Sequence, residues 1–514
     1  MRKALFAIFG MAAMFAACSQ TVSASSNDDE EKASATESSD SKGADDGSSG
    51  SGSSEDVLDK DCVGEPGKPW DGTTAKEFAC GSGTKLSPYI ILTAEQLAKL
   101  AFIVGANEKE YEGKYYKLAA DIKLNDGKVI DDKGALVADS SKLHKWTPIG
   151  NSSVAFTGNF DGNGHTVSGM FINTTSSHNG LFGNSSGTVQ NVTVADSWVT
   201  GGNATAGILG NLKGTGILKG SINRASIIGT GNVTGGVIGS YESVCCSKVG
   251  NVENVENAGF ITGVKTVGGV IGSGQNIRIT EAFNKGEIIG TSNTGGIAGN
   301  LGSNSVLSKT FNYAKVSGNE HTAGIAGYMG YGLNCGTTIK QATLTNSINW
   351  GEINGEKFTA GVIGKNECST NKDVANTAKI NGTNYVAGLF GFVKNSATEN
   401  GYNVGDIYGN IYVGGISGHN EVGVSQSIYS TGKVDGDSLV GLMIGYNYNT
   451  TMADYYYLKQ GNQEPFGQNN GGGVATPKTE SEMKSADFAK LLGDDFVYDS
   501  GLNDGYPVLV WEKE

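Results

Sequence analysis

Two rows of side chains in the middle of this chain combine residue type and spacing in a way that suits chemistry or binding. Phe358, Tyr385 and Tyr412 follow one another at equal intervals along the sequence, and Tyr408, near the last of them, is expected to support this row. Exposed rings of this kind would offer apolar faces to sugars or to a partner protein. The second row is charged and alternates in sign; it consists of Glu287, Lys315, Glu352, Lys379, Asp406 and Lys433.

The charged row suggests either catalysis or structural pairing. Enzymes that cleave polysaccharides place two carboxylates on either side of the bond to be broken. In this row each acid is followed by a lysine one repeat later, and the next acid comes two repeats later. Opposite charges that face each other on neighbouring strands attract, and like charges repel. The pattern therefore favours a structural charge ladder, and we predict no catalytic residues.

Metal and cofactor chemistry would need residues that the chain does not offer in a recognisable pattern. None of the five histidines is followed by Glu-x-x-His, the spacing that holds zinc in many peptidases. Cys245, Cys246, Cys335 and Cys368 could together bind zinc, but no Cys-x-x-Cys spacing supports this. We therefore expect no metal and no cofactor.

A Gly-x-x-Gly phrase occurs ten times, at nearly constant intervals along the chain. A repeat of this kind, with a period of roughly 30 residues, is typical of a solenoid, in which one small unit stacks on the next. The first residues of the copies are Gly180, Gly207, Gly236, Gly269, Gly296, Gly324, Gly361, Gly388 and Gly415, with Leu442 in this place in the tenth.

A second phrase, Asn-x-small-x-aliphatic-x-Gly, precedes the first from the third copy onward. In the unit that begins at Asn349, this alternation predicts a short strand with Ile353 facing inward. The closing Gly355 is expected at a corner with positive φ. The asparagines of the phrase are Asn223, Asn257, Asn284, Asn312, Asn349, Asn376 and Asn403, and Ser430 takes this place in the last unit.

The fold class follows from the glycine content. The chain holds 79 glycines, and each would weaken a helix by about 1 kcal/mol. We therefore predict an all-β fold, a parallel β-helix of about ten or more coils over residues 150–454. Small α-containing segments, 62–149 and 455–514, are expected to cap its two ends, because solenoids need such caps.

Each capping segment carries a helix signal. Thr93 with Gln96, and Thr479 with Glu482, fit the capping box that opens a helix. The second helix is expected to run through Leu492. Strands are expected over residues 115–124 and 506–511.

The N-terminal segment, 1–61, predicts export and anchoring. Arg2 and Lys3 precede an apolar run up to Ala17 that is too short to remain in a bilayer as a spanning helix. Small residues before Cys18 resemble a bacterial lipobox, so we expect residues 1–17 to be a lipoprotein signal peptide and Cys18 to be lipidated. The alternative is ordinary secretion with cleavage near Ala17. The lipid would attach the protein to the membrane, with an outer-membrane or cell-surface location favoured.

Residues 18–61 are rich in Ser and Gly, and they contain twelve acidic residues and three lysines. Such a segment buries too little apolar surface to fold, so it is expected to be a disordered tether. It holds most of the chain's net charge of −14. The remaining chain therefore has no basic footprint for nucleic acid.

The cysteines predict an oxidising compartment. Cys62 and Cys80 are the most plausible disulfide, at the entrance to the folded region. The pairing of Cys245, Cys246, Cys335 and Cys368 stays open.

Several phrases resemble those of a known family. Residues 180–183 and their successors are similar to the GLUG repeat of bacterial surface proteins, and residues 88–97, 160–167 and 504–509 resemble further segments of GLUG-containing proteins. The resemblance covers about residues 86–511 and implies an extracellular, cell-associated repeat protein. Some relatives are metallopeptidases that cleave immunoglobulin A through a His-Glu-x-x-His zinc site, which has no counterpart in this chain.

The sequence thus predicts a lipid-anchored, non-catalytic solenoid for adhesion or for binding a glycan or a protein, with the aromatic row as the candidate site. One alternative is a polysaccharide-degrading enzyme on the same scaffold. Another is a structural spacer, in which the stacked rings only stabilise the coils. The sequence leaves the oligomeric state open.

Overall fold

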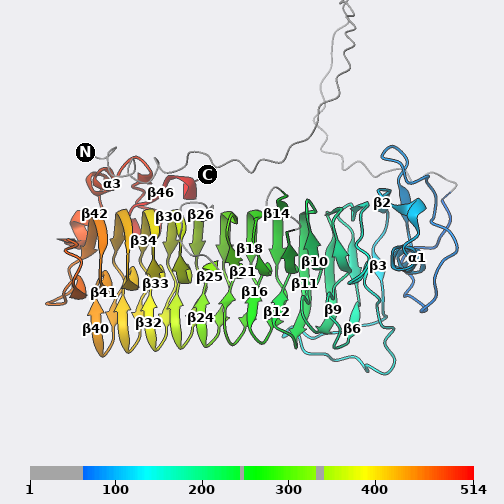
Figure 1. The fold of residues 1–514 in the computed structure, drawn as a ribbon, viewed down its shortest axis with the longest axis horizontal. Helices are drawn as coiled ribbons and strands as arrows, with labels where there is room; N and C mark the ends of the chain where they lie inside the picture. The colour runs from blue at the N-terminus through cyan, green and yellow to red at the C-terminus, as the bar shows by residue number, and fades with distance from the viewer. Residues whose placement is uncertain (1–61, 244–247, 332–340, 514) are drawn as a thin grey trace, which may run out of the picture. The chain divides into compact units, whose positions relative to one another are not determined.

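The computed structural model describes residues 62–243, 248–331 and 341–513, which form a parallel β-solenoid. Its coils stack on one another from the N-terminal to the C-terminal end (Figure 1). The predicted fold class is therefore confirmed. No helix in the described part of the chain is long and apolar enough to cross a membrane.

A single coil shows how the repeat is built. Four strands follow one another: β27 (Ile353–Asn354), β28 (Lys357–Ala360), β29 (Ile363–Glu367) and β30 (Ser369–Asn376). Each pairs in parallel with its counterpart in the next coil, so that Ile353 faces Ile380 and Ile363 faces Phe390. The coils are therefore in register, and every position in the repeat becomes a column along the stack.

Four ladders run along the stack, one for each of the four strands of the coil, and the β29-type and β30-type ladders contain the longer strands. The β29 ladder contains β7 (Phe182–Ser185), β10 (Leu209–Lys213), β13 (Ile238–Glu242), β17 (Ile271–Gly274), β21 (Ala298–Gly302), β25 (Ala326–Tyr331), β33 (Phe390–Lys394), β37 (Ser417–Asn420), β41 (Ile444–Asn447) and β43 (Phe466–Asn469). The β30 ladder contains β9 (Thr193–Gly201), β11 (Ile217–Gly229), β14 (Gly250–Asn257), β18 (Ile277–Asn284), β22 (Val306–Asn312), β26 (Ala342–Asn349), β34 (Ser396–Asn403), β38 (Gly423–Ser430) and β42 (Thr450–Leu458).

The two other ladders are made of shorter strands. The β28 ladder contains β12 (Val233–Gly235), β16 (Thr266–Gly268), β20 (Thr294–Gly295), β24 (Glu320–Ala323), β32 (Asn384–Ala387), β36 (Ile411–Gly414) and β40 (Ser438–Gly441). The β27 ladder contains β15 (Ile261–Thr262), β19 (Ile288–Ile289), β23 (Val316–Ser317), β31 (Ile380–Asn381), β35 (Ile407–Tyr408) and β39 (Val434–Asp435).

The aliphatic position of the second phrase fills the centre of the coils. Its side chains form one column and are completely or almost completely buried, which confirms the inward assignment of Ile353. The column consists of Ile227, Ile261, Ile288, Val316, Ile353, Ile380, Ile407 and Val434. Apolar burial of this kind contributes about 1.5–3 kcal/mol per side chain.

The asparagines of the second phrase form a continuous amide ladder inside the solenoid. All seven are fully buried. The first six each donate from Nδ2 to Oδ1 of the asparagine in the next coil, over bonds of 2.7–2.8 Å. Nδ2 of the last, Asn403, donates to the carbonyl of Gly405 at 2.9 Å. Nδ2 of Asn376 also donates to the carbonyl of Ala378, 2.9 Å away. The ladder thus satisfies amides that would be costly to bury alone.

The Gly-x-x-Gly phrase leaves room for this ladder. A Cβ atom on Gly361 would overlap Oδ1 of Asn376, and one on Gly388 would overlap Asn403. In the tenth copy the residue in the ladder position is Tyr457, which pairs with Ser430. Leu442, which takes the glycine position in this copy, is buried.

The closing glycine of the second phrase has a different role from the predicted one. Gly355 and its counterparts are not among the residues with positive φ. A Cβ on Gly355 would instead collide with the side chain of Thr359, and one on Gly382 would lie 2.7 Å from Cγ2 of Val386. Close approach of side chains at the corner, rather than a left-handed backbone, therefore requires glycine.

The N-terminal segment contains the predicted helix, α1 (Ala94–Gly105), with the capping box of Thr93 and Gln96. Leu97 and Leu100 of α1 join the core of the coils. The expected strand over residues 115–124 is two short strands, β2 (Tyr115–Leu118) and β3 (Ile122–Lys123).

The stack begins before residue 150, which corrects the predicted boundary between the N-terminal cap and the solenoid. β1 (Tyr89–Ile91) pairs in parallel with β2, β2 with β4 (Asn159–Asp161), and β4 with β8 (Thr188–Gln190). β5 (Thr166–Ser168) joins β3 to β9, and β6 (Phe171–Asn173) also pairs with β9. These coils lack the two glycine phrases, so the repeat pattern could not reveal them.

The C-terminal segment forms two helices where one was expected. The Thr479 capping box opens α2 (Glu480–Met483), and Ser485 caps a second helix, α3 (Ala486–Leu492). In the region of the expected final strand, β46 (Val508–Leu509) pairs antiparallel with β45 (Phe496–Val497), and a 3₁₀ helix follows over Val510–Lys513. β44 (Thr476–Lys478) pairs with β42 in the last coil.

Much of this C-terminal segment lies along the flank of the β30 ladder rather than over the end of the stack (Figure 1). Lys372 pairs with Asp495 at 3.3 Å, and the hydroxyl of Tyr402 donates to the carboxylate of Glu512 at 2.8 Å. The reason is an apolar column on the outer face of the ladder. Ile348, Ala375, Tyr402 and Tyr429 are buried there in one cluster with Met483, Phe488 and Leu492.

Cys62 and Cys80 form the predicted disulfide. Cys368 is buried and also disulfide-bonded. Cys245, Cys246 and Cys335 lie outside the described residues, as do Cys18 and the expected signal peptide and tether.

Replacing Asn376 with alanine is expected to lower the free energy of unfolding by about 2–4 kcal/mol. The change removes two ladder bonds and leaves Oδ1 of Asn403 without its ladder donor, and an unpaired buried group costs about 1–3 kcal/mol. Urea denaturation followed by circular dichroism measures the loss. The control is Asn384→Ala at a partly exposed position, expected to change stability by less than about 0.5 kcal/mol. Equal losses in the two variants would contradict the role of the ladder.

Candidate functional site

The predicted aromatic row is a stack of rings in neighbouring coils. Phe358 and Tyr385 have ring centres 4.7 Å apart, and Tyr385 and Tyr412 lie 4.6 Å apart with planes inclined by only 6°. His321 extends the stack by one coil, 5.0 Å from Phe358. All four side chains are partly exposed. The register of the β28 ladder therefore brings together the three residues that the sequence predicted.

A second column of rings lies beside this stack, in the β29 ladder. Phe392, His419 and Tyr446 follow one another in register. Their contacts with one another and with the first stack are mostly edge-to-face, for example between His419 and Tyr446 at 4.8 Å. They recur along the sequence at the same interval as the first row, a signal that could have identified them.

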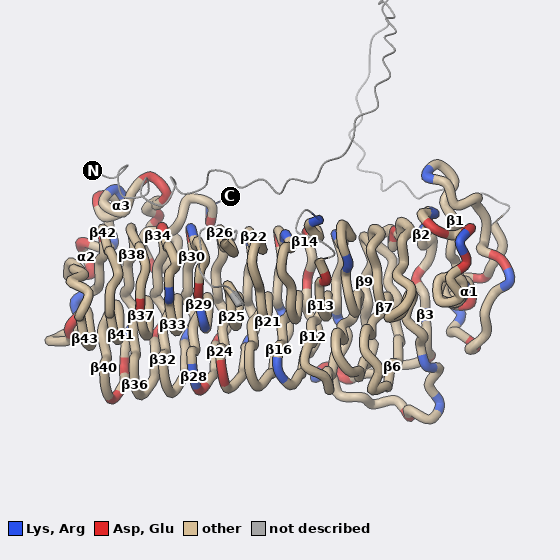
Figure 2. Tube along the Cα trace, viewed as in Figure 1, with Lys and Arg blue, Asp and Glu red and all other residues tan. Residues whose placement is uncertain are grey.

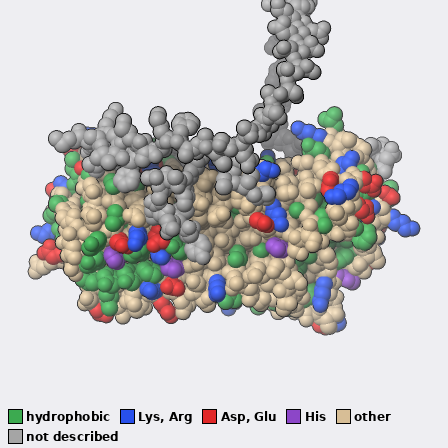
Figure 3. All heavy atoms as spheres, in the orientation of Figure 1, with side chains coloured by type: hydrophobic (Ala, Val, Ile, Leu, Met, Phe, Trp, Pro, Cys, Tyr) green, Lys and Arg blue, Asp and Glu red, His purple; other side chains and the backbone are tan. Residues whose placement is uncertain are grey.

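We call the two columns the aromatic strip, defined by His321, Phe358, Tyr385, Tyr412, Phe392, His419 and Tyr446. Two lysines border it: Nζ of Lys357 lies 4.8 Å from the ring centre of Phe358, and Lys365 covers Tyr328 next to the strip. Figure 3 shows hydrophobic side chains gathered with histidines and charged groups over the C-terminal coils. The strip thus combines apolar ring faces with polar ring edges and hydroxyls.

The backbone of the first stack is left-handed. His321, Phe358, Tyr385 and Tyr412 have φ between 49° and 60°, a conformation that costs most residues about 1–2 kcal/mol. A second left-handed position occurs in the β30 ladder, and there the residues are polar: Asn254, Glu281, Lys309, Asn346, Asp373, Asn400, Ser427 and Asp454. Ring stacking, at about 0.5–1.5 kcal/mol per pair, offsets part of the cost in the aromatic stack.

Burial favours the uncharged forms of three groups in the strip. It lowers the pKa of His321 to about 3, helped by the positive charges of Lys365 and Lys357. Burial also lowers the pKa of His419, whereas it raises the pKa of the Tyr385 hydroxyl. The strip can therefore form stacking contacts and neutral hydrogen bonds with a ligand.

Tyr408 does not belong to the aromatic strip, which corrects the prediction that it supports the row. It lies in β35 of the β27 ladder, on another part of the coil. Its ring faces Nζ of Lys379 at 4.8 Å and Nζ of Lys433 at 5.3 Å. Nearness in sequence to Tyr412 was misleading because a tight corner separates the two strands.

The charged row stacks in register, as expected. Backbone N–H groups beside it bond to the carbonyls of successive members; Ile353, for example, donates to Lys379 at 3.1 Å. Oδ1 of Asp406 accepts from the backbone N–H of Lys433 at 2.9 Å, but other side chains of the row have partners outside it. Lys433 pairs with Asp435 at 2.8 Å, and Glu352 accepts from Asn381 at 2.9 Å.

No ion pair joins adjacent members of the charged row in the described coils. The ammonium groups of Lys379 and Lys433 lie over the ring of Tyr408 instead. Acidic and basic positions are interspersed along the described coils rather than gathered in a stripe of one sign (Figure 2).

Carboxylates do meet at one place on the β30 face. Asp373, Glu399 and Asp495 surround Lys372, whose Nζ lies 3.3 Å from Asp495 and 4.0 Å from Glu399. Asn400 donates to both Asp373 and Asp495 at 2.8 Å, and burial raises the pKa of Asp373. These groups hold the C-terminal segment in place. The part of the chain that is described contains no group of three or more His, Cys, Asp or Glu residues suited to a metal ion.

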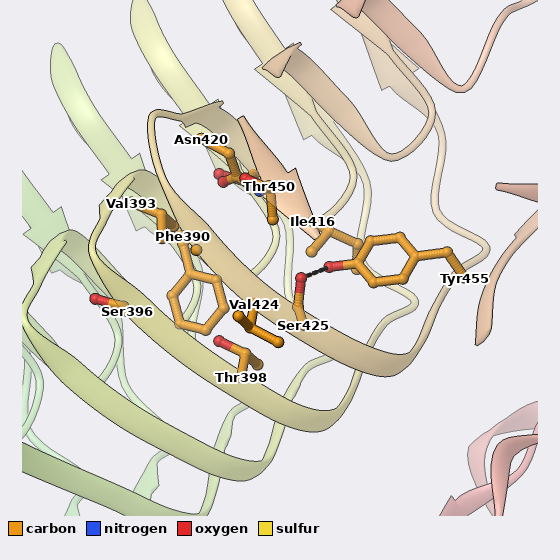
Figure 4. Close-up of a pocket in the computed structure, with 12 residues that line it drawn as sticks. Phe390, Val393, Ser396, Thr398, Ile416, Asn420, Val424, Ser425, Thr450 and Tyr455 are labelled. Atoms are coloured by element: carbon orange, nitrogen blue, oxygen red, sulfur yellow. Dashed lines mark hydrogen bonds between the residues drawn. The ribbon is translucent and has the colours of Figure 1, made fainter. Parts of the chain in front are cut away.

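The interior of the C-terminal coils is filled. A cavity between Phe390, Ile416 and Tyr455 measures only about 10 Å³, enough for about one water molecule. Figure 4 shows the side chains converging on it, with the hydroxyl of Tyr455 bonded to Ser425. This cavity is too small for a ligand.

Sequence similarity reaches parts of two longer proteins. The chain is 33% identical over 178 residues to halomucin from Haloquadratum walsbyi, a match that covers 34% of this chain and 2% of halomucin. It is 34% identical over 140 residues to a protein of Evansella cellulosilytica provisionally named a Gly-rich membrane protein, covering 27% of this chain and 14% of that protein. The chain thus spans a small part of the length of these relatives. No family model matches it.

Among solved structures, the chain is similar to a protein from Bacteroides ovatus provisionally identified as an immunoglobulin A1 protease. The two share 16% sequence identity with a TM-score of 0.38, and the alignment covers 84% of this chain and 95% of the other.

Changing His321 to Phe is expected to reduce the loss of stability on acidification. Because the pKa of His321 is lowered in the folded state, its neutral form gives full stability above the unfolded value of about 6.5, and stability is lost as the pH falls toward 3. Between pH 7 and pH 5 the unchanged protein should lose about 1–2 kcal/mol more than the variant. Urea denaturation at both pH values measures this difference, and parallel losses would contradict the burial of His321.

Proposed function

We propose that this protein is a non-catalytic, GLUG-type β-solenoid of the bacterial cell envelope that binds glycan or protein ligands through its aromatic strip. The strip itself is the observation that carries the proposal. Its rings are partly exposed, they lie on a rigid ladder of strands, and they form an uninterrupted surface across neighbouring coils.

The chemistry of the strip suits a ligand with apolar faces and polar edges. Stacked rings present flat apolar area, while the hydroxyls of Tyr385 and Tyr412 and the neutral imidazoles can form hydrogen bonds. The lysines at its border can bind acidic groups of a ligand. The four residues of the first stack all have a left-handed backbone. This supports a role in ligand binding as well as in stacking, because strained backbone is often retained at binding sites.

A location at the envelope is part of the proposal. The segment before Cys18 supports export and lipidation, and the residues after it suit a tether. The name of one similar protein includes the word membrane. A lipid-anchored solenoid on a long tether would hold the strip away from the membrane.

The binding proposal predicts that the purified full-length protein retains at least one polysaccharide on a glycan array without cleaving it. The triple variant Phe358→Ala, Tyr385→Ala and Tyr412→Ala should lose at least tenfold in affinity, since each exposed ring contributes about 0.5–1.5 kcal/mol to stacking. The control is Phe102→Ala, which removes a 61%-exposed ring from α1, outside the strip. If the triple variant and Phe102→Ala retain the polysaccharide equally well, the aromatic strip is not the binding site.

Analysis of the array products separates binding from catalysis. Shortened oligosaccharides would instead support a polysaccharide-degrading enzyme, with the carboxylates around Lys372 as the first residues to change. Absence of any retained glycan would favour a protein ligand or a structural spacer.

The anchoring proposal predicts that Cys18→Ser releases the protein from membranes. Without its thiol this position cannot accept a lipid, and the remaining chain would lose its main attachment. Cell fractionation followed by immunoblotting should move the variant from the membrane pellet to the soluble fraction. If the variant remains in the pellet to the same extent as the unchanged protein, lipidation at Cys18 is not the anchor.

A further inference from the structure

The C-terminal segment and the flank of the solenoid enclose a groove of about 520 Å³. Its volume falls in the range of about 300–1,000 Å³ that is usual for small-molecule sites. The solenoid side contributes Phe311 and Trp350, and the C-terminal segment contributes Trp511 and Glu512. This groove shares no residue with the aromatic strip.

An interrupted column of rings forms one wall of the groove. Tyr313 and Trp350 occupy the same position in neighbouring coils and stack with ring centres 4.7 Å apart and planes inclined by 12°. Phe311 also stacks on Trp350, at 5.9 Å. In the next coil the equivalent residue is Thr377, because Asn349 pairs with Asn376. Threonine is too small to cover the indole, so Trp350 remains 39% exposed.

Polar groups also line the groove. Thr377, Asn346, Lys309 and Asn503 line the groove together with Glu512. The carboxylate of Glu512 already accepts from the hydroxyl of Tyr402 and from the backbone of Leu509. Nε1 of Trp511 is buried and has no hydrogen-bond partner among the described residues, and a buried donor of this kind ordinarily has one.

We infer that the groove is a carbohydrate subsite that takes one pyranose ring, stacked on Trp350 in the place that Thr377 leaves vacant in the column of rings. A pyranose has an apolar C–H face for the indole and hydroxyl groups around its edge for the amides, the ammonium group and the carboxylate. An aromatic side chain from a peptide would match the indole but has at most one hydroxyl group for the polar groups that line the groove. The inference stands apart from the proposed function of the strip, since the two sites lie on different ladders.

The test uses the full-length protein and four probes: methyl β-D-glucopyranoside, methyl β-D-galactopyranoside, methyl α-D-mannopyranoside and methyl N-acetyl-β-D-glucosaminide. Titration followed by tryptophan fluorescence and ligand-observed NMR should show saturable binding of at least one probe. Trp350→Ala should weaken that binding at least tenfold, whereas Phe102→Ala, which removes an exposed ring from α1 outside both sites, should leave it unchanged.

A second variant tests the vacant position itself. Thr377→Phe should place a ring over Trp350 and block the probe while leaving the indole and the rest of the groove in place. Circular dichroism and urea denaturation check that both variants remain folded. Loss of binding in both folded variants would support the subsite.

Three results would overturn the inference. They are the absence of saturable binding by any of the four probes, full binding by folded Thr377→Phe, and equal weakening by Trp350→Ala and Phe102→Ala. The last result would assign the loss of binding to the fold as a whole. If the groove proves not to bind sugars, the glycan-array test of the aromatic strip is unaffected.

Discussion

The seven buried asparagines impose one constraint on which much of the rest of the solenoid depends. An amide sealed from solvent must find both donors and acceptors, and here the five inner asparagines find them in the coils before and after, whereas the two at the ends have one such partner. These partners exist only when neighbouring coils are in register, because a shift by one residue would turn the asparagine to the other face. The ladder continues across Asn223–Asn257 and Asn312–Asn349, where the spacing grows to 34 and 37 residues. Extra residues can therefore be inserted between two coils, provided that the next asparagine still lies in the ladder.

Register has a direct consequence for the surface. Once coils are aligned, each outward position is repeated along the stack, so that a single residue type placed three or four times becomes a continuous surface. The aromatic strip arises in this way from residues one repeat apart. The exposed charges obey the same alignment, but their long side chains reach across columns, which is why Lys379 and Lys433 both lie over Tyr408 rather than beside an acid of their own row.

The C-terminal segment adds a feature that the repeats cannot produce by themselves. Repeats provide flat faces, and a cleft requires something that breaks the periodicity. Here the segment docks on Tyr402 and Tyr429 and stands beside a column of rings that stops at Thr377. The groove lies between a regular surface and an irregular one. Two kinds of candidate site thus result from one scaffold: an extended strip where the repeat is maintained and an enclosed groove where it is interrupted.

By itself the sequence determined the fold class, the spacing of the coils, the inward aliphatic column and the three-ring core of the strip, because all of these follow from a period that can be counted along the chain. It also determined both helix starts, since a capping box is a local interaction. Only the tertiary structure decided where the stack begins, because the first coils lack the repeated phrases. It alone showed that the closing glycines are required by crowding rather than by positive φ, that Tyr408 belongs to another face, and that the C-terminal segment covers the flank. Each of these depends on atoms that meet across the stack or from distant parts of the chain, and such contacts leave no periodic signal in the order of the residues.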